Sequence, residues 1–419
     1  MDSVVQDGAT KTQRNEADMA YPDFEDEQFL NDHVASVLAF YEPNVVDPAG
    51  GFFQHFADDG IVYDPETRHL VSSTRFIFNY VNAYERTGQL YYRDWAAHGF
   101  AYLQSHHRRD NGAYIWQRNG VDIEDGRAMA YGHAFVMLAA AYAARLDIDG
   151  AKDTIAAVWD FMETHFWQAE YNAYADERDA SLATLDPYRG QNANMHSVEA
   201  LIAAYETTRK PRYLERAETV AAQFCVTLAA SAEGQIWEHY DSAWAHDWTY
   251  NIDKPDDLFK PWGFQPGHQV EWAKLLLQLD ALAPRDWYLG TARHLFDTAM
   301  AKGWDQEYGG LVYGYAPDGK FADAHKYFWV HAEAFAAAWR LWRRTGDRKY
   351  RADYHRLWQW SWDHLIDHKH GAWFRIVTRS GDWIEPWKSP AGKVDYHTMG
   401  ACWDVVSVGG MNAAAGAET

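Results

Sequence analysis

The chain has 419 residues, of which 47% are hydrophobic and 23% charged, so its composition is that of a globular protein able to bury a large core. Its 38 Lys and Arg residues against 60 Asp and Glu residues give a net charge of −22. Without a basic run, this balance argues against a nucleic-acid or anionic-membrane partner. The 21 Trp, 26 Tyr and 20 Phe residues suit either a ring-rich helical core or the walls of a polyol pocket.

The N-terminal segment is polar, and we expect a flexible tail over residues 1–20 followed by one folded domain over 21–419. The tail contains no apolar core of signal-peptide length, and no later segment reaches the ~18 uninterrupted apolar residues of a membrane span. Cys225 and Cys402 are too few for a disulfide framework or a Cys-rich zinc site. We therefore expect a cytoplasmic monomer or homodimer.

A short phrase of Gly or Asn followed by an aromatic residue recurs six times along the chain. Its copies begin at Gly51, Gly112, Asn172, Gly234, Gly310 and Gly371. The steps between these positions are 61, 60, 62, 76 and 61 residues, which indicates one period with a single insertion. The phrase follows a turn-forming residue and predicts a short extended connection.

Two helical stretches lie between successive phrases, such as 129–145 followed by 151–166, each with apolar residues at i, i+3, i+4 and i+7. Each repeat is therefore predicted to be a helical hairpin. The first and last repeats are as aromatic as the middle ones, which favours a closed ring over an open solenoid with polar caps. The sequence predicts an all-α protein, an (α/α)6 barrel of six hairpins with short extended connections. The insertion falls at 244–260, a polar stretch that predicts a long loop over one end.

One helix of each hairpin opens with a basic or titratable residue. Aligned by this feature, the six positions are Arg75, His133, His196, His268, His331 and His397. If these helices form the inner ring, the alignment places all six side chains in one slot that points into one mouth of the barrel. A single His is more often a cap or a satisfied buried ring, and His133 and His331 are the two that we expect to be structural.

Two of these histidines have a glutamate three residues later, in the pairs His268 with Glu271 and His196 with Glu199. Residues three apart share a helix face, so each glutamate is predicted to orient its imidazole for acid/base work. The same spacing could instead supply metal ligands. We expect no metal and no organic cofactor.

Four classes of function can be weighed against a titratable barrel mouth. Proton removal next to a carbonyl needs a base, an acid and a cation for the enediolate, which two histidines and Arg75 would provide. A glycoside hydrolase of this fold would need two opposed carboxylates at the mouth, whereas the repeated mouth residues are mainly His, with Glu271 and Glu333 behind them. A carbohydrate-binding module would explain the aromatic residues but not so many titratable groups. Nucleophilic catalysis lacks a recognisable motif.

At these residues the sequence resembles the N-acylglucosamine 2-epimerase family over about 21–408. The motifs that carry the resemblance are Ser-Thr-Arg-Phe at 73–76, Tyr-Gly-His-Ala-Phe at 131–135, Asn-Ala-Asn-Met-His at 192–196, Pro-Gly-His-Gln-Val-Glu-Trp at 266–272 and Asp-Tyr-His at 395–397. The family has an (α/α)6 barrel fold, which agrees with the repeat analysis.

The resemblance implies roles for individual residues. His268 and His397 would be the acid/base pair, with Glu271 supporting His268. The residues expected to hold or surround the sugar are Arg75, Tyr131, Asn192, His196, Trp329 and Glu333.

The resemblance also implies the reaction. The forms at 192–196 and 265–272 look nearer to the mannose isomerase branch of the family, so we expect a small-molecule sugar substrate and interconversion of free D-mannose and D-fructose through an enediolate. A 2-epimerase of the N-acylglucosamine or cellobiose type and an (α/α)6 glycoside hydrolase are the alternatives. Lys393 stands where the sulfoquinovose branch carries Gln, which disfavours a sulfonated sugar.

Overall fold

The computed structural model describes residues 21–415, so the tail predicted over residues 1–20 lies outside the described part of the chain. Within 21–415 there are twelve α-helices. Their bounds are α1 Glu27–Tyr41, α2 Leu70–Thr87, α3 Leu90–Tyr102, α4 Ala130–Arg145, α5 Ala151–His165, α6 Gln191–Thr208, α7 Pro211–Ala222, α8 Pro266–Leu282, α9 Tyr288–Gly303, α10 Phe328–Thr345, α11 Arg348–His364 and α12 Tyr396–Ala415.

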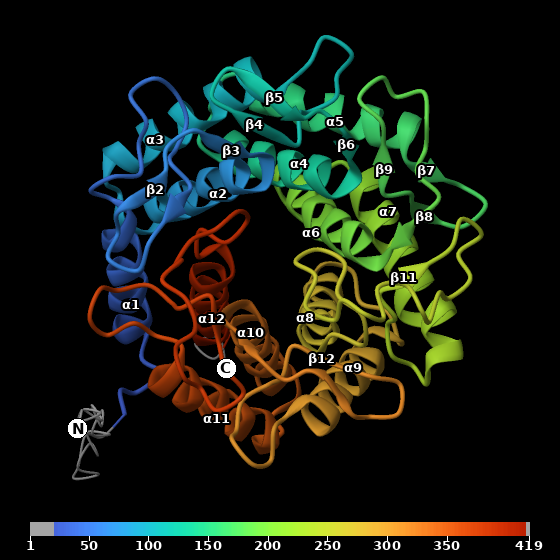
Figure 1. Ribbon diagram of the computed structural model, residues 1–419. Helices are drawn as coiled ribbons and strands as arrows, with labels where there is room; N and C mark the ends of the chain where they lie inside the picture. The colour runs from blue at the N-terminus through green and yellow to red at the C-terminus, as the bar shows by residue number, and fades with distance from the viewer. Residues whose placement is uncertain (1–20, 416–419) are drawn as a thin grey trace, which may run out of the picture.

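The helices form two concentric rings (Figure 1). The even-numbered helices α2 to α12 make the inner ring, and each odd-numbered helix packs outside it. The ring closes where α12 packs against α2, and α1 packs on α12, so the two ends of the chain together make the sixth hairpin. The predicted (α/α)6 barrel is thereby confirmed.

Local signals in the sequence explain where several helices begin and end. Asp26 and Asp347 cap α1 and α11, because their carboxylates accept backbone N–H groups of the first turn. Gly88 and Gly346 end α2 and α10 in the left-handed conformation, at φ values of 69° and 71°. Pro266 occupies the first turn of α8, where its missing N–H is not needed.

The connections are short antiparallel ribbons, as predicted from the Gly-aromatic phrases. The strands are β1 His55–Phe56, β2 Val62–Asp64, β3 Thr67–His69, β4 Gln117–Asn119, β5 Asp122–Asp125, β6 Ala128–Met129, β7 Trp167–Gln168, β8 Ala173–Tyr174, β9 Glu177–Arg178, β10 Arg189–Gly190, β11 His239–Tyr240, β12 Gly314–Tyr315, β13 Phe321–Asp323, β14 Lys326–Tyr327 and β15 Ile376–Val377. They pair as β1-β2, β3-β4-β5, β6-β9, β7-β8, β10-β11, β12-β13 and β14-β15. Strands β3, β6, β10 and β14 end directly before the inner helices α2, α4, α6 and α10.

A buried polar clamp recurs in these connections. An aspartate in the turn after an outer helix binds a cation 21 residues later, which anchors the ribbon before the next inner helix. The pairs are Asp47 with Arg68 at 2.6 Å, Asp305 with Lys326 at 3.1 Å and Asp367 with Lys388 at 2.6 Å. Such buried pairs fix geometry, because the charges lose their partners if the ribbon shifts.

The inserted segment between β11 and α8 has no helix or strand of its own, in agreement with the predicted loop at 244–260. Phe259 of this loop packs against the rings of Trp116 and Tyr131, at centroid distances of 5.7 and 6.2 Å. The loop therefore covers part of the barrel mouth. Over the described residues, every helix is too short or too polar to cross a membrane.

Candidate active site

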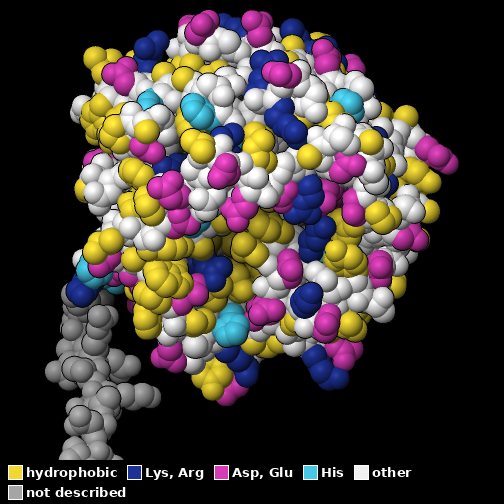
Figure 2. Space-filling model, turned by 45° about the horizontal axis from the view of Figure 1, so that its top comes forward, with side chains coloured by type: hydrophobic (Ala, Val, Ile, Leu, Met, Phe, Trp, Pro, Cys, Tyr) yellow, Lys and Arg dark blue, Asp and Glu magenta, His cyan; other side chains and the backbone are white. Residues whose placement is uncertain are grey.

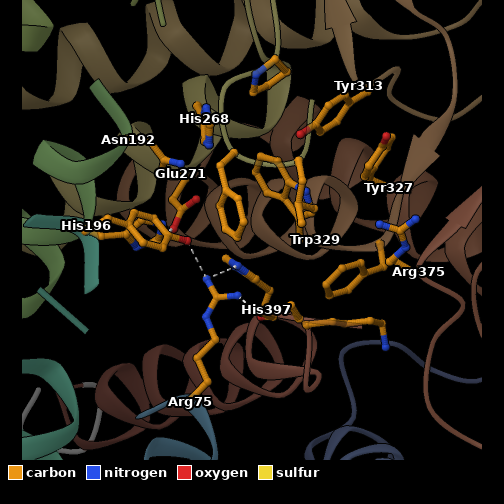
Figure 3. A pocket seen from close by; sticks show the side chains of 18 residues that line it. Arg75, Asn192, His196, His268, Glu271, Tyr313, Tyr327, Trp329, Arg375 and His397 are labelled. Atoms are coloured by element: carbon orange, nitrogen blue, oxygen red, sulfur yellow. Dashed lines mark hydrogen bonds and ion pairs between the residues drawn. The ribbon is translucent and has the colours of Figure 1, made fainter. Parts of the chain in front are cut away.

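A pocket opens at the mouth of the barrel where the inner helices begin (Figure 3). Of the nine residues predicted to act on or hold the sugar, eight line it: Arg75, Tyr131, Asn192, His196, His268, Glu271, Trp329 and His397. Leu258, Phe259 and Pro261 of the inserted loop form part of its wall. Glu333 was predicted to lie among the sugar contacts, but the structure places it behind His397.

The six aligned basic residues do not share one slot, which corrects the sequence alignment. Arg75 and His196 are the sixth residues of α2 and α6, whereas His268 is the third residue of α8 and His397 the second of α12. These positions differ by three or four residues, about one turn, so the four side chains share a face at two depths. The inner helices start at different points of the repeat. The sequence alignment matched residue types and treated this difference as variation in loop length.

His133 and His331 occupy a different position, the fourth residue of α4 and α10, which lies on the other side of the helix. His331 Nε2 accepts the Leu311 N–H at 3.0 Å, and its Nδ1 donates to the carbonyl of Tyr327 at 3.2 Å. His133 is held in the same way by Tyr114 N and Met129 O. Both rings therefore anchor the Gly-aromatic connection, as expected of structural histidines.

The base of the pocket contains His397, backed by a carboxylate and an ammonium group. His397 Nδ1 donates to Glu333 Oε1 at 2.7 Å, and Lys274 Nζ contacts the other oxygen of Glu333. Burial lowers the pKa of His397 to about 4, although Glu333 opposes the shift. The ring is therefore neutral near pH 7, with its proton on Nδ1 and a lone pair on Nε2.

His268 is held by a carboxylate that the sequence did not indicate. Its Nδ1 donates to Glu238 Oε2 at 2.9 Å, and Gln191 Nε2 donates to the same oxygen at 2.9 Å. The predicted pairing of His268 with Glu271 is therefore wrong. The ring of His268 lies beside Trp329, with centroids 5.0 Å apart, and its Nε2 makes no hydrogen bond with any described residue.

Glu271 instead presents a buried carboxyl group to the pocket. Neither of its oxygens has a hydrogen-bond partner in residues 21–415, and the nearest imidazole nitrogen is Nδ1 of His196 at 3.9 Å. Burial and the negative charge of Glu333 raise the pKa of Glu271 well above its usual range. An unpaired, protonated carboxyl in a pocket is a hydrogen-bond donor available to a ligand.

Arg75 supplies the positive charge of the pocket. One of its terminal nitrogens, Nη2, lies 3.2 Å from His397 Nε2 and 3.3 Å from the Tyr131 hydroxyl (Figure 3). Its guanidinium group is held between the rings of Phe135 and Tyr396, at 4.5 and 4.8 Å from their centroids. This packing fixes the cation next to the imidazole that it contacts.

His196 lies one turn deeper, where its Nδ1 donates to Glu199 Oε2 at 2.9 Å, as the spacing predicted. Tyr396 donates to the other oxygen of Glu199. Burial lowers the pKa of His196, so this ring also favours its neutral form. Asn192 lines the pocket, and its Oδ1 has no hydrogen-bond partner among the described side chains and backbone.

Two sets of side chains bring possible metal ligands within 4.8 Å of one another: His196 with Glu199 and Glu271, and Glu271 with Glu333 and His397. Both sets are engaged by protein donors, because Glu199 accepts from His196 and Glu333 accepts from His397. The ammonium group of Lys274 beside Glu333 would also repel a cation. The groups therefore fit a hydrogen-bonded network better than a metal site.

Sequence reasoning missed Glu238 and Lys274. Glu238 follows the fourth Gly-aromatic phrase directly, and nothing in the local pattern links it to His268, 30 residues later. Lys274 carried a usable signal, because it interrupts an apolar run of α8 and a lysine buried among apolar residues needs a partner. Arg375 and Lys393 also line the pocket.

The hollow at the mouth is visible from outside (Figure 2). Hydrophobic side chains lie in the hollow, and Lys and Arg side chains are interspersed with Asp and Glu around it. The outer face therefore offers mixed charge, with an apolar wall inside that suits the C–H face of a sugar.

Comparisons with known proteins identify the family of the chain. Residues 51–401 match the N-acylglucosamine 2-epimerase family. The chain is 50% identical over 389 residues to a D-mannose isomerase of Marinomonas mediterranea, a match that covers 93% of this chain and 99% of that protein. A crystal structure of a D-mannose isomerase superposes with a TM-score of 0.91 at 50% identity, covering 93% of this chain and all of that one.

A cellobiose 2-epimerase from Spirochaeta thermophila has the same fold, with a TM-score of 0.81 at 21% identity over 91% of this chain and 96% of that one. The barrel fold and the extent of these matches agree. The chain therefore belongs to the N-acylglucosamine 2-epimerase family and is a sugar isomerase.

Proposed function

We propose that the chain interconverts free D-mannose and D-fructose by proton transfer through an enediolate. The observation that carries the proposal is the pair formed by His268 and His397. Each imidazole is held at Nδ1 by a buried carboxylate, and each belongs to the wall of the same pocket. Two oriented imidazoles can act as base and acid near neutral pH.

The reaction begins with opening of the sugar ring. One imidazole Nε2 then removes the proton from C2, and the C–H electron pair forms the C1–C2 double bond while the aldehyde oxygen O1 becomes protonated. Loss of the O2 proton gives the C2 carbonyl, and C1 takes a proton from an imidazolium ion. The atoms balance without an oxidant, because the aldose and ketose are isomers.

Negative charge develops on O1 and O2 during these steps. Arg75 is fixed beside His397 and provides a cation for that charge. Glu271 has a raised pKa and free oxygens, so it provides a neutral O–H donor at the same place. Donors that are oriented before the reaction contribute about 2.7–4 kcal/mol each in other enzymes.

The charges of the outer pocket favour a neutral sugar over a phosphorylated or sulfonated one. Arg375 is bound by Glu385 at 2.8 Å, and Lys393 is bound by Asp395 at 2.6 Å. Each of these two cations is already paired with a carboxylate, so among the described cations that line the pocket only Arg75, which contacts His397, lacks one. The similarity to D-mannose isomerases over almost the whole chain supports mannose as that sugar.

The proposal is tested with the purified, chelator-treated protein and mannose in D2O, with products and deuterium at C1 and C2 followed by NMR. We expect fructose to form. Its C1 should carry either deuterium from the solvent or the proton that was transferred from C2 of mannose. Glucose as the only product would identify a 2-epimerase instead.

A parallel incubation with mannosides covers the hydrolase alternative, for which release of free sugar is the diagnostic result. Absence of any product or exchange with free hexoses would refute proton transfer. Mannose 6-phosphate is the matched control for charge, and we expect it to be turned over far more slowly than mannose.

A further inference from the structure

A second cavity lies directly behind the active site, inside the barrel. It has a volume of about 530 Å³, enough to hold many water molecules. Its rim is formed near the C-terminal ends of inner helices, by residues such as Arg86, Arg145 and Ser407. His397 lines both cavities. The layer formed by His397, Glu333 and Lys274 therefore separates the mouth of the barrel from its rear.

Lys274 of α8 lies in that layer and lines the rear cavity. Its ammonium group is buried and contacts Glu333, the carboxylate that accepts the Nδ1–H of His397. Although burial opposes the charge, the glutamates around it raise the pKa of Lys274 above its usual range, so it is a cation at every working pH. Lys274 lies 123 residues before His397 in the chain, and no local motif links the two residues, so only packing joins them.

The carboxylates of the layer depend on this cation. Burial alone would raise the pKa of Glu333, but Lys274 and His397 hold it below its usual range. Without the ammonium group, the buried Glu333 carboxylate would keep only His397 as a partner, and burial would favour its protonated form. A neutral Glu333 would be a poorer acceptor for Nδ1–H, and Nε2 of His397 would become a weaker base.

We propose that Lys274 is a positioning residue that keeps Glu333 ionised and so fixes the proton of His397 on Nδ1. The rear cavity gives solutes access to the Lys274 site independently of the sugar. This inference rests on the proposed role of His397 as an acid/base group. It assigns the rear cavity a route to the catalytic layer that does not pass through the sugar pocket.

The first test is Lys274→Ala with added n-propylammonium, which has the size and charge of the atoms removed. We expect kcat to fall about 10- to 100-fold with KM for mannose nearly unchanged, because the lysine does not line the sugar pocket. Propylammonium should restore much of kcat without competing with mannose, whereas propan-1-ol at the same concentration should not.

Two further variants separate this role from a general loss of stability. Lys388→Ala removes a buried lysine that is paired with Asp367 in a connection, and we expect a lower melting temperature, unchanged kcat and no effect of the amine. Ala203→Leu narrows the rear cavity. In the Lys274→Ala background it should abolish the rescue, while alone it should leave turnover intact.

A spectroscopic measurement keeps the inference testable apart from turnover. In protein labelled with ¹⁵N-histidine, His397 should show the Nδ1–H tautomer in the wild type and lose that preference in Lys274→Met, which retains the bulk of the side chain. Failure of the wild type to isomerise mannose would overturn the proposed function but not this result. Normal kcat in Lys274→Met, or an unchanged tautomer, would overturn the inference itself.

Discussion

Two pairs of histidines near the starts of the inner helices differ in what holds them. His133 and His331 bind backbone groups through both ring nitrogens, so each ring is fully engaged in anchoring a connection. His268 and His397 bind a buried carboxylate through Nδ1 and turn Nε2 toward the pocket, where Nε2 of His397 meets Arg75 and not a backbone group. A position near a helix start does not by itself make a catalytic group. The partner of the second nitrogen decides whether an imidazole is structural or can move a proton.

The largest expected effect comes from removing either pocket imidazole. His268→Ala and His397→Ala should each lower kcat by about 100- to 10,000-fold, the usual contribution of acid/base catalysis. Initial rates with mannose give the effect, and circular dichroism checks that the fold is retained. Folded His268→Ala or His397→Ala protein with near-normal kcat would remove the distinction between the two pairs.

A smaller loss is expected when the carboxylate behind an imidazole is neutralised. Glu238→Gln keeps the shape of the side chain but replaces the charged acceptor of His268. We expect kcat to fall about 10- to 100-fold with little change in KM. Glu163→Gln is the matched control, because Glu163 binds Tyr174 and Arg216 away from the pocket. Equal kcat values for the two variants would contradict the assignment.

The structural pair should instead affect stability. His331→Ala leaves the buried Leu311 N–H without its acceptor, which should cost about 1–3 kcal/mol of unfolding free energy. Gln269 is also the fourth residue of its helix and accepts the Ile236 N–H at 3.0 Å, so His331→Gln should cost less than His331→Ala. Urea unfolding measures both, and kcat of the folded protein should stay unchanged in each.

The smallest effect is on the pH dependence of stability. Burial lowers the pKa of His331 to about 3 and that of His133 to about 4, from an ordinary value of 6.5. Between these values the unfolded chain binds more protons than the folded one, so the unfolding free energy should fall as the pH drops below about 6.5. His331→Gln should make that decrease shallower, as urea unfolding between pH 4.5 and 7.5 would show. An identical slope would mean that the imidazole is not buried in its neutral form.

The sequence by itself determined the architecture and most of the pocket. The six-fold recurrence of the Gly-aromatic phrase and the helical spacing between its copies were sufficient to predict the barrel, because both are local patterns that can be recognised in the linear sequence. The basic residues near the inner helix starts led to Arg75, His196, His268 and His397, which do meet in one pocket. His196 with Glu199 was also predictable, since three residues along a helix fix a contact.

The tertiary structure alone decided which carboxylate orients each catalytic imidazole. Glu238 and Glu333 reach His268 and His397 across 30 and 64 residues, and Lys274 completes the second set from a third helix. Such contacts depend on how far each inner helix is shifted and rotated in the ring, which no local spacing encodes. The shift also separated His331 from His397, although the alignment had placed them in one slot. Helical periodicity fixes the face of a residue, whereas the packing of neighbouring helices fixes its partner.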